Sequence, residues 1–157
     1  FTMKQKPLAI LLFLIHAAMT SFVEAVYPST YYFETKLDHG SPFGVDDAKN
    51  STENDVFKIR YLVDDSYFND PKSAGKLRPI LFYAGNEGDV TGFYNNSGFM
   101  TTTLAEEYGG LVVFGEHRYF GESFPFDKAV AFKEGYNTYL TVENTMMDYV
   151  ELIKHIK

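Results

Sequence analysis

Two short polar segments of this chain combine residue types that can position and stabilise reacting groups. Gly85-Asn86-Glu87-Gly88 follows the apolar run 80–83, and Glu116-His117-Arg118-Tyr119 follows the apolar run 111–114. Glycines let a backbone approach a ligand closely, and fixed N–H donors can stabilise a developing negative charge. Continuous apolar runs between turn signals are typical of strands in a parallel sheet. Because function in such sheets lies where strands end and loops begin, we expect both segments to lie near a site.

Alternating residues earlier in the chain predict two further strands. Apolar and polar side chains alternate over 31–37 and again over 57–63, and the first of these runs is closed by Asp38-His39-Gly40. The stretch 44–55 between them is polar and is predicted to be an exposed loop. We therefore expect an antiparallel hairpin with a long connection ahead of the two buried strands.

Two helices are predicted from apolar residues at helical spacing. Between the buried strands, Phe99, Met100, Leu104 and Tyr108 indicate a helix that ends at Gly109-Gly110. Thr141 can cap a second helix, in which Lys154, His155 and Lys157 suit the carboxyl end of the helix dipole. The apolar stripe of this second helix consists of Val142, Met146, Tyr149, Val150, Ile153 and Ile156. The chain thus reads as hairpin, strand, helix, strand, helix.

Several blocks of this pattern closely resemble one family of serine exopeptidases, which contains lysosomal Pro-X carboxypeptidase and dipeptidyl peptidase II. The matching blocks are FYAGNEGDV at 82–90, NNSGF at 95–99 and FGEHRYFGESFPF at 114–126. The pairing of GNEGD with EHRYFGES is far more specific than a lone glycine motif. The resemblance implies an α/β-hydrolase fold, of which residues 26–157 would be the N-terminal portion, ending before the Gly-x-Ser-x-Gly nucleophile elbow.

The loop 85–88 has two possible roles. In α/β-hydrolases the loop after the corresponding strand supplies one backbone N–H to the oxyanion hole, and the resemblance favours that role for Gly85, Asn86, Glu87 and Gly88. An ordinary turn between strand and helix also favours Gly and Asn. A carboxylate beside an oxyanion would be repulsive. We therefore expect Glu87 to face away from the site, to pair with a buried base or to bind a substrate amine.

The segment after the second buried strand is predicted to support the site rather than to act in it. Glu116, Arg118 and Tyr119 are interpreted as architecture, with Arg118 clamping Glu87 or Glu116 in a bidentate pair. His117 is not assigned as a base, because the catalytic histidine of this fold comes after the nucleophile. Ser123 lacks the second glycine of an elbow. No catalytic residue is therefore assigned within the chain, which is expected to be inactive by itself.

The first 25 residues have the features of a secretory signal peptide. Lys4 and Lys6 precede the apolar run 8–15, and Val23-Glu24-Ala25 offers small or moderate residues at a cleavage site. The run is short of the ~20 apolar residues of a spanning helix, so no stable membrane insertion is predicted. In the secretory pathway the sequons at Asn50 and Asn95 are candidate glycosylation sites.

Composition excludes several classes of function. The net charge of −7 and the lack of a basic stripe argue against nucleic-acid binding. The absence of cysteine removes thiol nucleophiles and thiolate metal sites. The histidines and carboxylates have no metal-ligand spacing, and no phosphate-binding glycine loop is present, so neither a metal nor another cofactor is predicted.

The resemblance implies that the whole protein cleaves peptides next to proline through a Ser-Asp-His triad that lies beyond residue 157. Its peptide substrates would carry proline near the scissile bond, and its location would be lysosomal or extracellular. Three alternatives remain: release of an N-terminal dipeptide, as in dipeptidyl peptidase II; a non-catalytic secreted binding protein on the same fold; and an esterase or lipase. The last lacks support because the usual His-Gly-Gly-Gly loop is absent.

Overall fold

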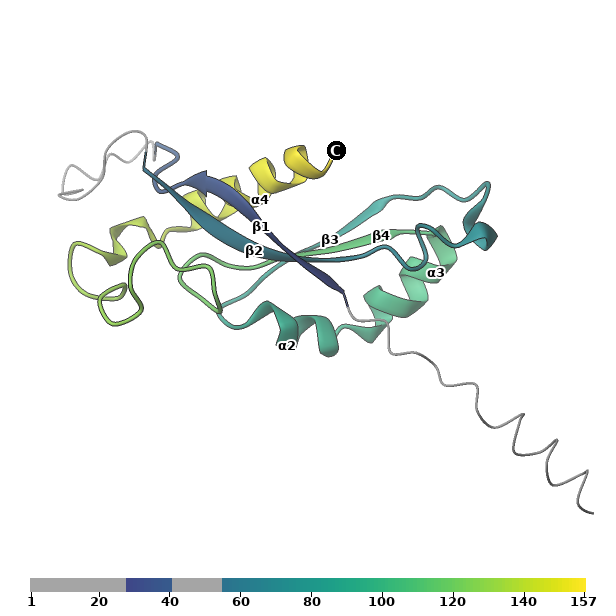
Figure 1. Ribbon diagram of the computed structural model, residues 1–157, viewed down its shortest axis with the longest axis horizontal. Helices are drawn as coiled ribbons and strands as arrows, with labels where there is room; N and C mark the ends of the chain where they lie inside the picture. Colours follow the sequence, from purple (N-terminus) through teal and green to yellow (C-terminus); the bar gives the residue numbers. More distant parts are fainter. Residues whose placement is uncertain (1–27, 41–54) are drawn as a thin grey trace, which may run out of the picture.

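The computed structural model describes residues 28–40 and 55–157, which form a four-stranded mixed sheet with helices on both faces (Figure 1). The order across the sheet is β1-β2-β4-β3. Neighbouring strands are antiparallel except for β3 and β4, which are parallel. The strands are β1 (Ser29–Lys36), β2 (Val56–Asp64), β3 (Ile80–Ala84) and β4 (Leu111–Gly115). The predicted antiparallel pair and the two predicted parallel strands are confirmed.

Helices α2 (Val90–Asn95) and α3 (Ala105–Tyr108) lie on one face of the sheet and α4 (Val142–Ile156) on the other (Figure 1). The helix predicted between the parallel strands is present, but its first part, Phe99–Leu104, is π-helical and only the last turn is α3. It ends as predicted, with Gly109 in the left-handed conformation at φ +63°. The sequence pattern did not predict α2, whose six residues are too few for an apolar stripe. Single 3₁₀ turns occupy Pro71–Ser73 and Asn137–Tyr139.

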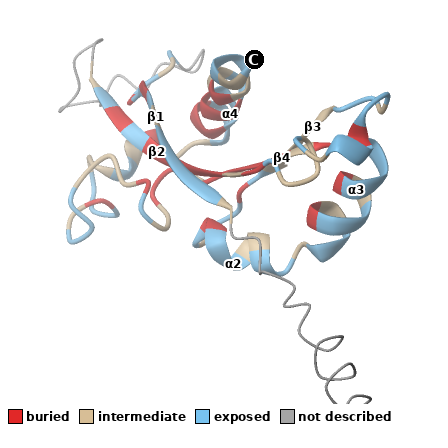
Figure 2. Cartoon of the chain, turned by 45° about the vertical axis from the view of Figure 1, so that its right-hand side comes forward, coloured by how far each residue is buried: buried red, intermediate tan, exposed pale blue. Residues whose placement is uncertain are grey.

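Strand β4 is buried along almost its whole length and carries the core on both of its sides (Figure 2). Val112 and Phe114 pack with Val90 of α2 and Ala105 of α3. Val113, which points the other way in the pleat, packs with Leu152 of α4 and with β2. This two-sided burial explains why the run 111–114 lacks polar alternation.

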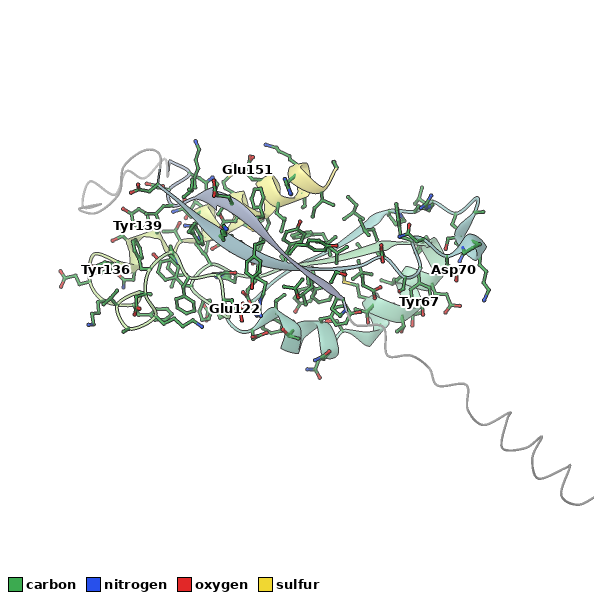
Figure 3. All side chains as sticks on the ribbon, in the orientation of Figure 1. Tyr67, Asp70, Glu122, Tyr136, Tyr139 and Glu151 are labelled. Atoms are coloured by element: carbon green, nitrogen blue, oxygen red, sulfur yellow. The ribbon has the colours of Figure 1, made fainter. Side chains whose placement is uncertain are left out.

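A third core cluster lies under the long connection between β4 and α4. It joins buried residues of the hairpin, such as Phe57 and Ile59, to Tyr119, Ala131 and Tyr139. Tyr136 and Tyr139 lie in this connection at one end of the molecule, and Tyr67 and Asp70 lie at the other end (Figure 3). The connection is therefore packed against the sheet by aromatic side chains although it is mostly irregular.

Helix α4 begins where it was predicted to begin, but its buried face overlaps the predicted apolar stripe only in part. The Thr141 hydroxyl accepts a hydrogen bond from the backbone N–H of Asn144, which confirms the predicted cap. Of the predicted apolar stripe, Val142 is 75% exposed and Met146 is 54% exposed. The buried side chains of the helix are Asn144, Thr145, Asp148, Tyr149 and Leu152, so Tyr149 is the one member of the predicted stripe that is buried. The predicted stripe was wrong for Val142, Met146 and Val150, because a buried cationic partner, described below, turns Asp148 inward.

Candidate active site

The loop that follows β3 starts in close contact with the end of β4. Because the two strands are parallel, Ala84 and Gly115 reach the same edge of the sheet as cross-strand partners. The N–H of Gly85 donates to the carbonyl of Gly115 at 2.9 Å. A Cβ on Gly85 would lie 2.3 Å from that carbonyl oxygen, so only glycine fits. The two segments that the sequence singled out are thus brought together, as predicted.

The loop itself is closed by its own hydrogen bonds. The side-chain oxygen of Asn86 accepts from the N–H of Glu87 at 2.8 Å, and the Asn86 carbonyl accepts from the N–H of Gly88 at 2.7 Å. With Gly85 bonded to Gly115, the Asn86 N–H is the one backbone donor of residues 85–88 that has no partner among residues 28–40 and 55–157. Asn86 and Glu87 are exposed, so Glu87 faces away from the core.

The carboxyl side of the loop is held by the start of α2. Asp89 caps this helix by accepting from the N–H of Thr91 at 2.8 Å, and it pairs with the Arg60 guanidinium at 2.9 Å. Hydrogen bonds from Thr91 and from Arg60 lower the pKa of Asp89 to about 2. The next N–H, that of Val90, donates to a carboxylate oxygen of Glu116 at 3.1 Å.

Glu116 is the centre of a buried polar network. Its carboxylate is fully buried and accepts from Arg60 at 2.5 and 3.2 Å, from the N–H of Glu122 at 2.9 Å and from the Ser123 hydroxyl at 2.8 Å. Gly121 must be glycine, because its φ is +55° and a Cβ at this position would overlap the carboxylate. Burial of a charge is costly unless it is paired and hydrogen-bonded, and Glu116 is both.

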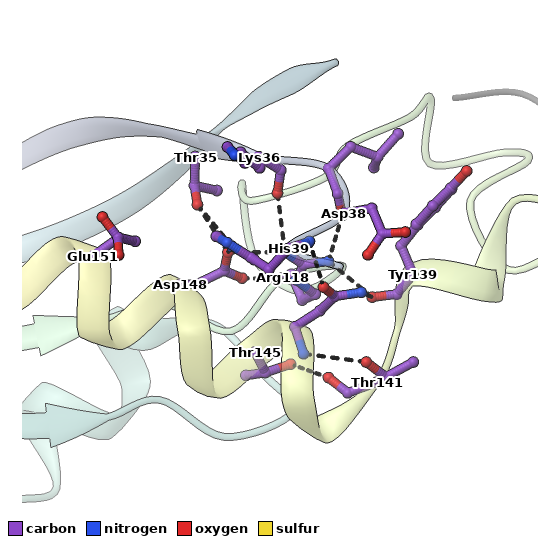
Figure 4. A network of polar contacts seen from close by, with 12 residues as sticks. Thr35, Lys36, Asp38, His39, Arg118, Tyr139, Thr141, Thr145, Asp148 and Glu151 are labelled. Carbon is purple, nitrogen blue, oxygen red and sulfur yellow. Dashed lines mark hydrogen bonds and ion pairs between the residues drawn. The ribbon is translucent and has the colours of Figure 1, made fainter. Parts of the chain in front are cut away.

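Arg118 pairs with Asp148 rather than with Glu87 or Glu116, so that prediction was wrong (Figure 4). The pair is bidentate, with distances of 2.7 and 2.8 Å between fully buried side chains. Arg118 also donates to the carbonyls of Lys36, Leu37 and Tyr139. The contacts of the two residues explain the difference, because Glu116 reaches the start of α2 while Arg118 reaches β1 and α4.

The remaining bonds of Asp148 tie the hairpin to α4. Its Oδ1 accepts from the Thr35 hydroxyl at 3.0 Å and contacts Nε2 of His39 at 2.8 Å (Figure 4). The backbone N–H of His39 donates to the side chain of Asn144 at 2.9 Å. The sequence did not indicate that His39 is part of this network, because its partners in α4 lie more than 100 residues later.

The other residues expected to support the site are structural. Tyr119 is buried at φ +68°, and its hydroxyl donates to the carbonyl of Tyr136. Nδ1 of His117 contacts the Arg118 carbonyl at 2.7 Å, and its ring packs edge-on against Phe120. Ser123 is buried, and its hydroxyl is occupied by Glu116 and by the N–H of Arg60. In the described part of the chain, His117 and Ser123 are therefore not arranged as base and nucleophile.

One contact of the loop was not predicted. The hydroxyl of Tyr149, on α4, donates to the carbonyl of Gly85 at 2.7 Å. Burial raises the pKa of Tyr149 well above its usual value, so the hydroxyl stays protonated and remains a donor. In the sequence, this contact was indicated only by the presence of Tyr149 on the predicted helical stripe.

Three further expectations concern the surface and bound ions. Asn95 is exposed at the end of α2, as an acceptor for a glycan must be, while Asn50 and the predicted signal peptide lie outside the described residues. The described residues contain no cluster of three or more potential metal ligands. Among the same residues, no helix has the length and hydropathy needed to cross a membrane.

Comparison with known proteins identifies a family and several relatives. Residues 45–157 match the family described as Serine carboxypeptidase S28. The chain is 45% identical over 130 residues to human lysosomal Pro-X carboxypeptidase, covering 82% of this chain and 23% of that protein. It is 44% identical over 130 residues to the mouse protein of the same name, covering 82% of this chain and 23% of that protein. Prolyl carboxy peptidase like protein 5 of Caenorhabditis elegans is 35% identical over 101 residues, which cover 64% of this chain and 18% of that protein.

The chain thus spans less than a quarter of the length of these curated relatives. The family match nevertheless covers well over half of the chain, including both parallel strands, the loop 85–88, Glu116 and the Arg118–Asp148 pair. The chain therefore belongs to the serine carboxypeptidase S28 family.

Proposed function

We propose that residues 26–157 form the N-terminal part of an α/β-hydrolase peptidase domain, preceded by a secretory signal peptide at 1–25. The mixed sheet, with a loop and a helix joining two parallel strands, supports this fold. The nucleophilic serine, its histidine and its aspartate lie beyond residue 157 in this proposal, and the described residues supply the loop beside them.

The activity proposed for the whole protein is serine-type removal of a C-terminal residue that follows proline. The observation that carries it is the family match over residues 45–157, together with relatives named lysosomal Pro-X carboxypeptidase. The substrates would be peptides with proline next to the scissile bond, and the protein would act in the secretory pathway, in lysosomes or outside the cell. The alternative of dipeptide release differs only in how the substrate is bound.

In this reaction the serine attacks the carbonyl carbon of proline, and the carbonyl oxygen becomes an oxyanion. Two N–H donors would stabilise it: one from the residue after the nucleophile and one from the loop after β3. The Asn86 N–H suits the second role because it alone among the backbone donors of residues 85–88 is unoccupied within the described residues. We call residues Gly85–Gly88 the oxyanion loop.

The activity is tested with the full-length protein that contains this chain. Purified protein is incubated with peptides ending in proline and one further residue, and with peptides that begin with a residue followed by proline. Release of the C-terminal residue, abolished by a serine-directed fluorophosphonate, is the expected result. Release of the N-terminal dipeptide would favour the alternative, and no cleavage of either set would contradict a peptidase function.

The donor is tested by two substitutions at one position. Asn86→Pro removes the N–H and is expected to lower kcat by about 100-fold or more, the usual effect of losing one oxyanion donor. Asn86→Ala keeps the N–H but loses the side-chain acceptor for Glu87, and a smaller loss is expected. Equal activity of the two variants would exclude the Asn86 N–H as a donor.

A further inference from the structure

We propose that Tyr149 is a positioning residue for catalysis, because its hydroxyl sets the direction of the Asn86 N–H. This inference rests on the proposed function, since it assigns a role within the same oxyanion loop. It concerns a residue of α4, a helix that follows the loop by more than 50 positions and makes no other hydrogen bond to it among the described residues.

The geometry of the peptide group links the Tyr149 contact to the Asn86 N–H. The carbonyl of Gly85 and the N–H of Asn86 belong to one peptide group, which is planar and trans, so the two bonds point in opposite directions. The Tyr149 hydroxyl binds this carbonyl oxygen at 2.7 Å. Fixing the carbonyl on the α4 side of the peptide therefore directs the N–H away from α4.

Tyr149 is itself buried and closely packed. Tyr149 is 4% exposed, and its ring packs edge-on against Phe82 of β3 with ring centres 5.7 Å apart. On β4, a Cβ at Gly115 would approach the ring to 3.1 Å, so the ring fills the space that this glycine leaves. Contacts with both parallel strands thus fix the position of the hydroxyl. The hydroxyl in turn fixes the orientation of the peptide group between Gly85 and Asn86.

The oxyanion loop is also anchored on its carboxyl-terminal side, at Asp89 and Val90. Glu116 binds the N–H of Val90, and Arg60 binds the carboxylate of Asp89. Together with the bond from Gly85 to Gly115, these contacts leave only Asn86 to Gly88 free of direct anchors within the described part of the chain. A bonded carbonyl also polarises its peptide group and makes the opposite N–H a better donor.

The test is the Tyr149→Phe variant of the full-length protein, which loses the hydroxyl and keeps the ring. We expect kcat to fall by about 10-fold, less than for a lost donor, because the N–H remains but is less well aimed. KM should change by less than about two-fold. The affinity for a peptidyl proline boronic acid, whose tetrahedral adduct places an oxygen in the oxyanion hole, should fall by the same factor as kcat/KM.

Tyr119→Phe is the matched control. Tyr119 is also buried, and its hydroxyl also donates to a backbone carbonyl, that of Tyr136, in the connection away from the loop. Both variants are expected to lower the melting temperature similarly, and only Tyr149→Phe is expected to lower kcat and boronate affinity. Glu116→Gln would weaken the bond from the Val90 N–H to Glu116, which anchors the loop on its other side. It would also leave Arg60 without its buried anionic partner, so Tyr149→Phe is the milder and more specific variant.

The outcomes separate this inference from the proposed function. If the wild-type protein cleaves its peptides and Tyr149→Phe keeps full kcat and boronate affinity, the inference is wrong and the function stands. Loss of kcat without a parallel loss of boronate affinity would also overturn it, as would equal losses in the two tyrosine variants. A wild-type protein that cleaves no peptide would overturn both.

Discussion

The buried charges of Glu116 and Arg118 have different partners and therefore different structural roles. Glu116 and Arg118 are two positions apart and both fully buried, yet they belong to separate networks. Glu116 binds Arg60 and the start of α2, whereas Arg118 binds Asp148 and the end of β1. Each charge is paired and hydrogen-bonded, so each tolerates burial. The oxyanion loop lies against the first of these networks.

At Gly85 the constraint is steric. Gly85→Ala would place a methyl group 2.3 Å from the Gly115 carbonyl oxygen and force the ends of β3 and β4 apart. We expect a loss of about 2 kcal/mol or more in the free energy of unfolding, with a loss of activity. Gly92→Ala is the control, because no atom lies within 4 Å of its Cβ position and Gly92 is in α2, where alanine is favoured. Urea denaturation of the full-length variants measures both, and equal stability of the two would contradict the steric argument.

At Asp89 the effect is electrostatic and depends on pH. The pKa of Asp89 is about 2 in the folded chain against an ordinary value of 3.8, so its charge stabilises the folded state above pH ~4 and this stabilisation is lost as the pH falls toward 2. Asp89→Asn keeps the helix cap and removes the charge. Because the carboxylate is 55% exposed, we expect a cost below about 1 kcal/mol. Thermal melting from pH 7 to pH 3 should show a constant difference down to pH ~4.5 and a smaller one below it.

Among the elements, α4 connects the candidate site to the hairpin. One side of the helix presents Tyr149 to Gly85, and Asp148 binds Arg118 and Thr35. The helix therefore stabilises two regions that are distant from each other in sequence. The Thr141 side chain caps the N-terminus of the helix.

The cap can be tested without touching either contact. Thr141→Ala removes the acceptor for the N–H of Asn144, and it should lower the free energy of unfolding by about 1 kcal/mol. Thr141→Ser retains the hydroxyl and should be close to wild type. Chemical denaturation of both variants in the full-length protein is the measurement, and a stable alanine variant would show that the cap is not needed.

Across the molecule, long-range polar contacts hold the sheet, the connection and α4 together. Arg118 alone reaches β1, Tyr139 in the connection and Asp148 in α4. Within the described residues, β3 pairs only with β4, and α4 exposes Val142, Met146 and Val150. In the proposed α/β-hydrolase, the sheet would continue at the open edge of β3.

The Arg118–Asp148 pair should behave as a unit. Arg118→Met leaves a buried carboxylate without its cation, and Asp148→Leu leaves a buried guanidinium without its anion. Each is expected to cost about 3–5 kcal/mol, while the double variant should cost clearly less than the sum. A double-mutant cycle on the full-length protein measures the coupling, and additive costs would mean that the two side chains act independently.

The local features of this protein follow from its amino-acid sequence. Apolar runs and alternation are properties of neighbouring residues, so they predicted all four strands, the parallel pair and the helix that starts after Thr141. The glycines at 85 and 109 were found because a close approach and a left-handed turn each demand that residue type. The motifs GNEGD and EHRYFGES indicated the family that the match over residues 45–157 shows.

Which side chains meet, in contrast, depends on the tertiary structure. The partner of Arg118 was predicted to be a nearby glutamate and is instead Asp148, and α4 turns Asp148 inward for the same reason. The contact from Tyr149 to Gly85 joins residues 64 positions apart. Such pairings depend on the relative placement of elements and on the high cost of an unpaired buried charge. The periodicity of one segment carries no information about how elements are placed relative to one another or about which buried charges must pair. For this reason the sequence indicated the loop 85–88 but not the side chains that orient it.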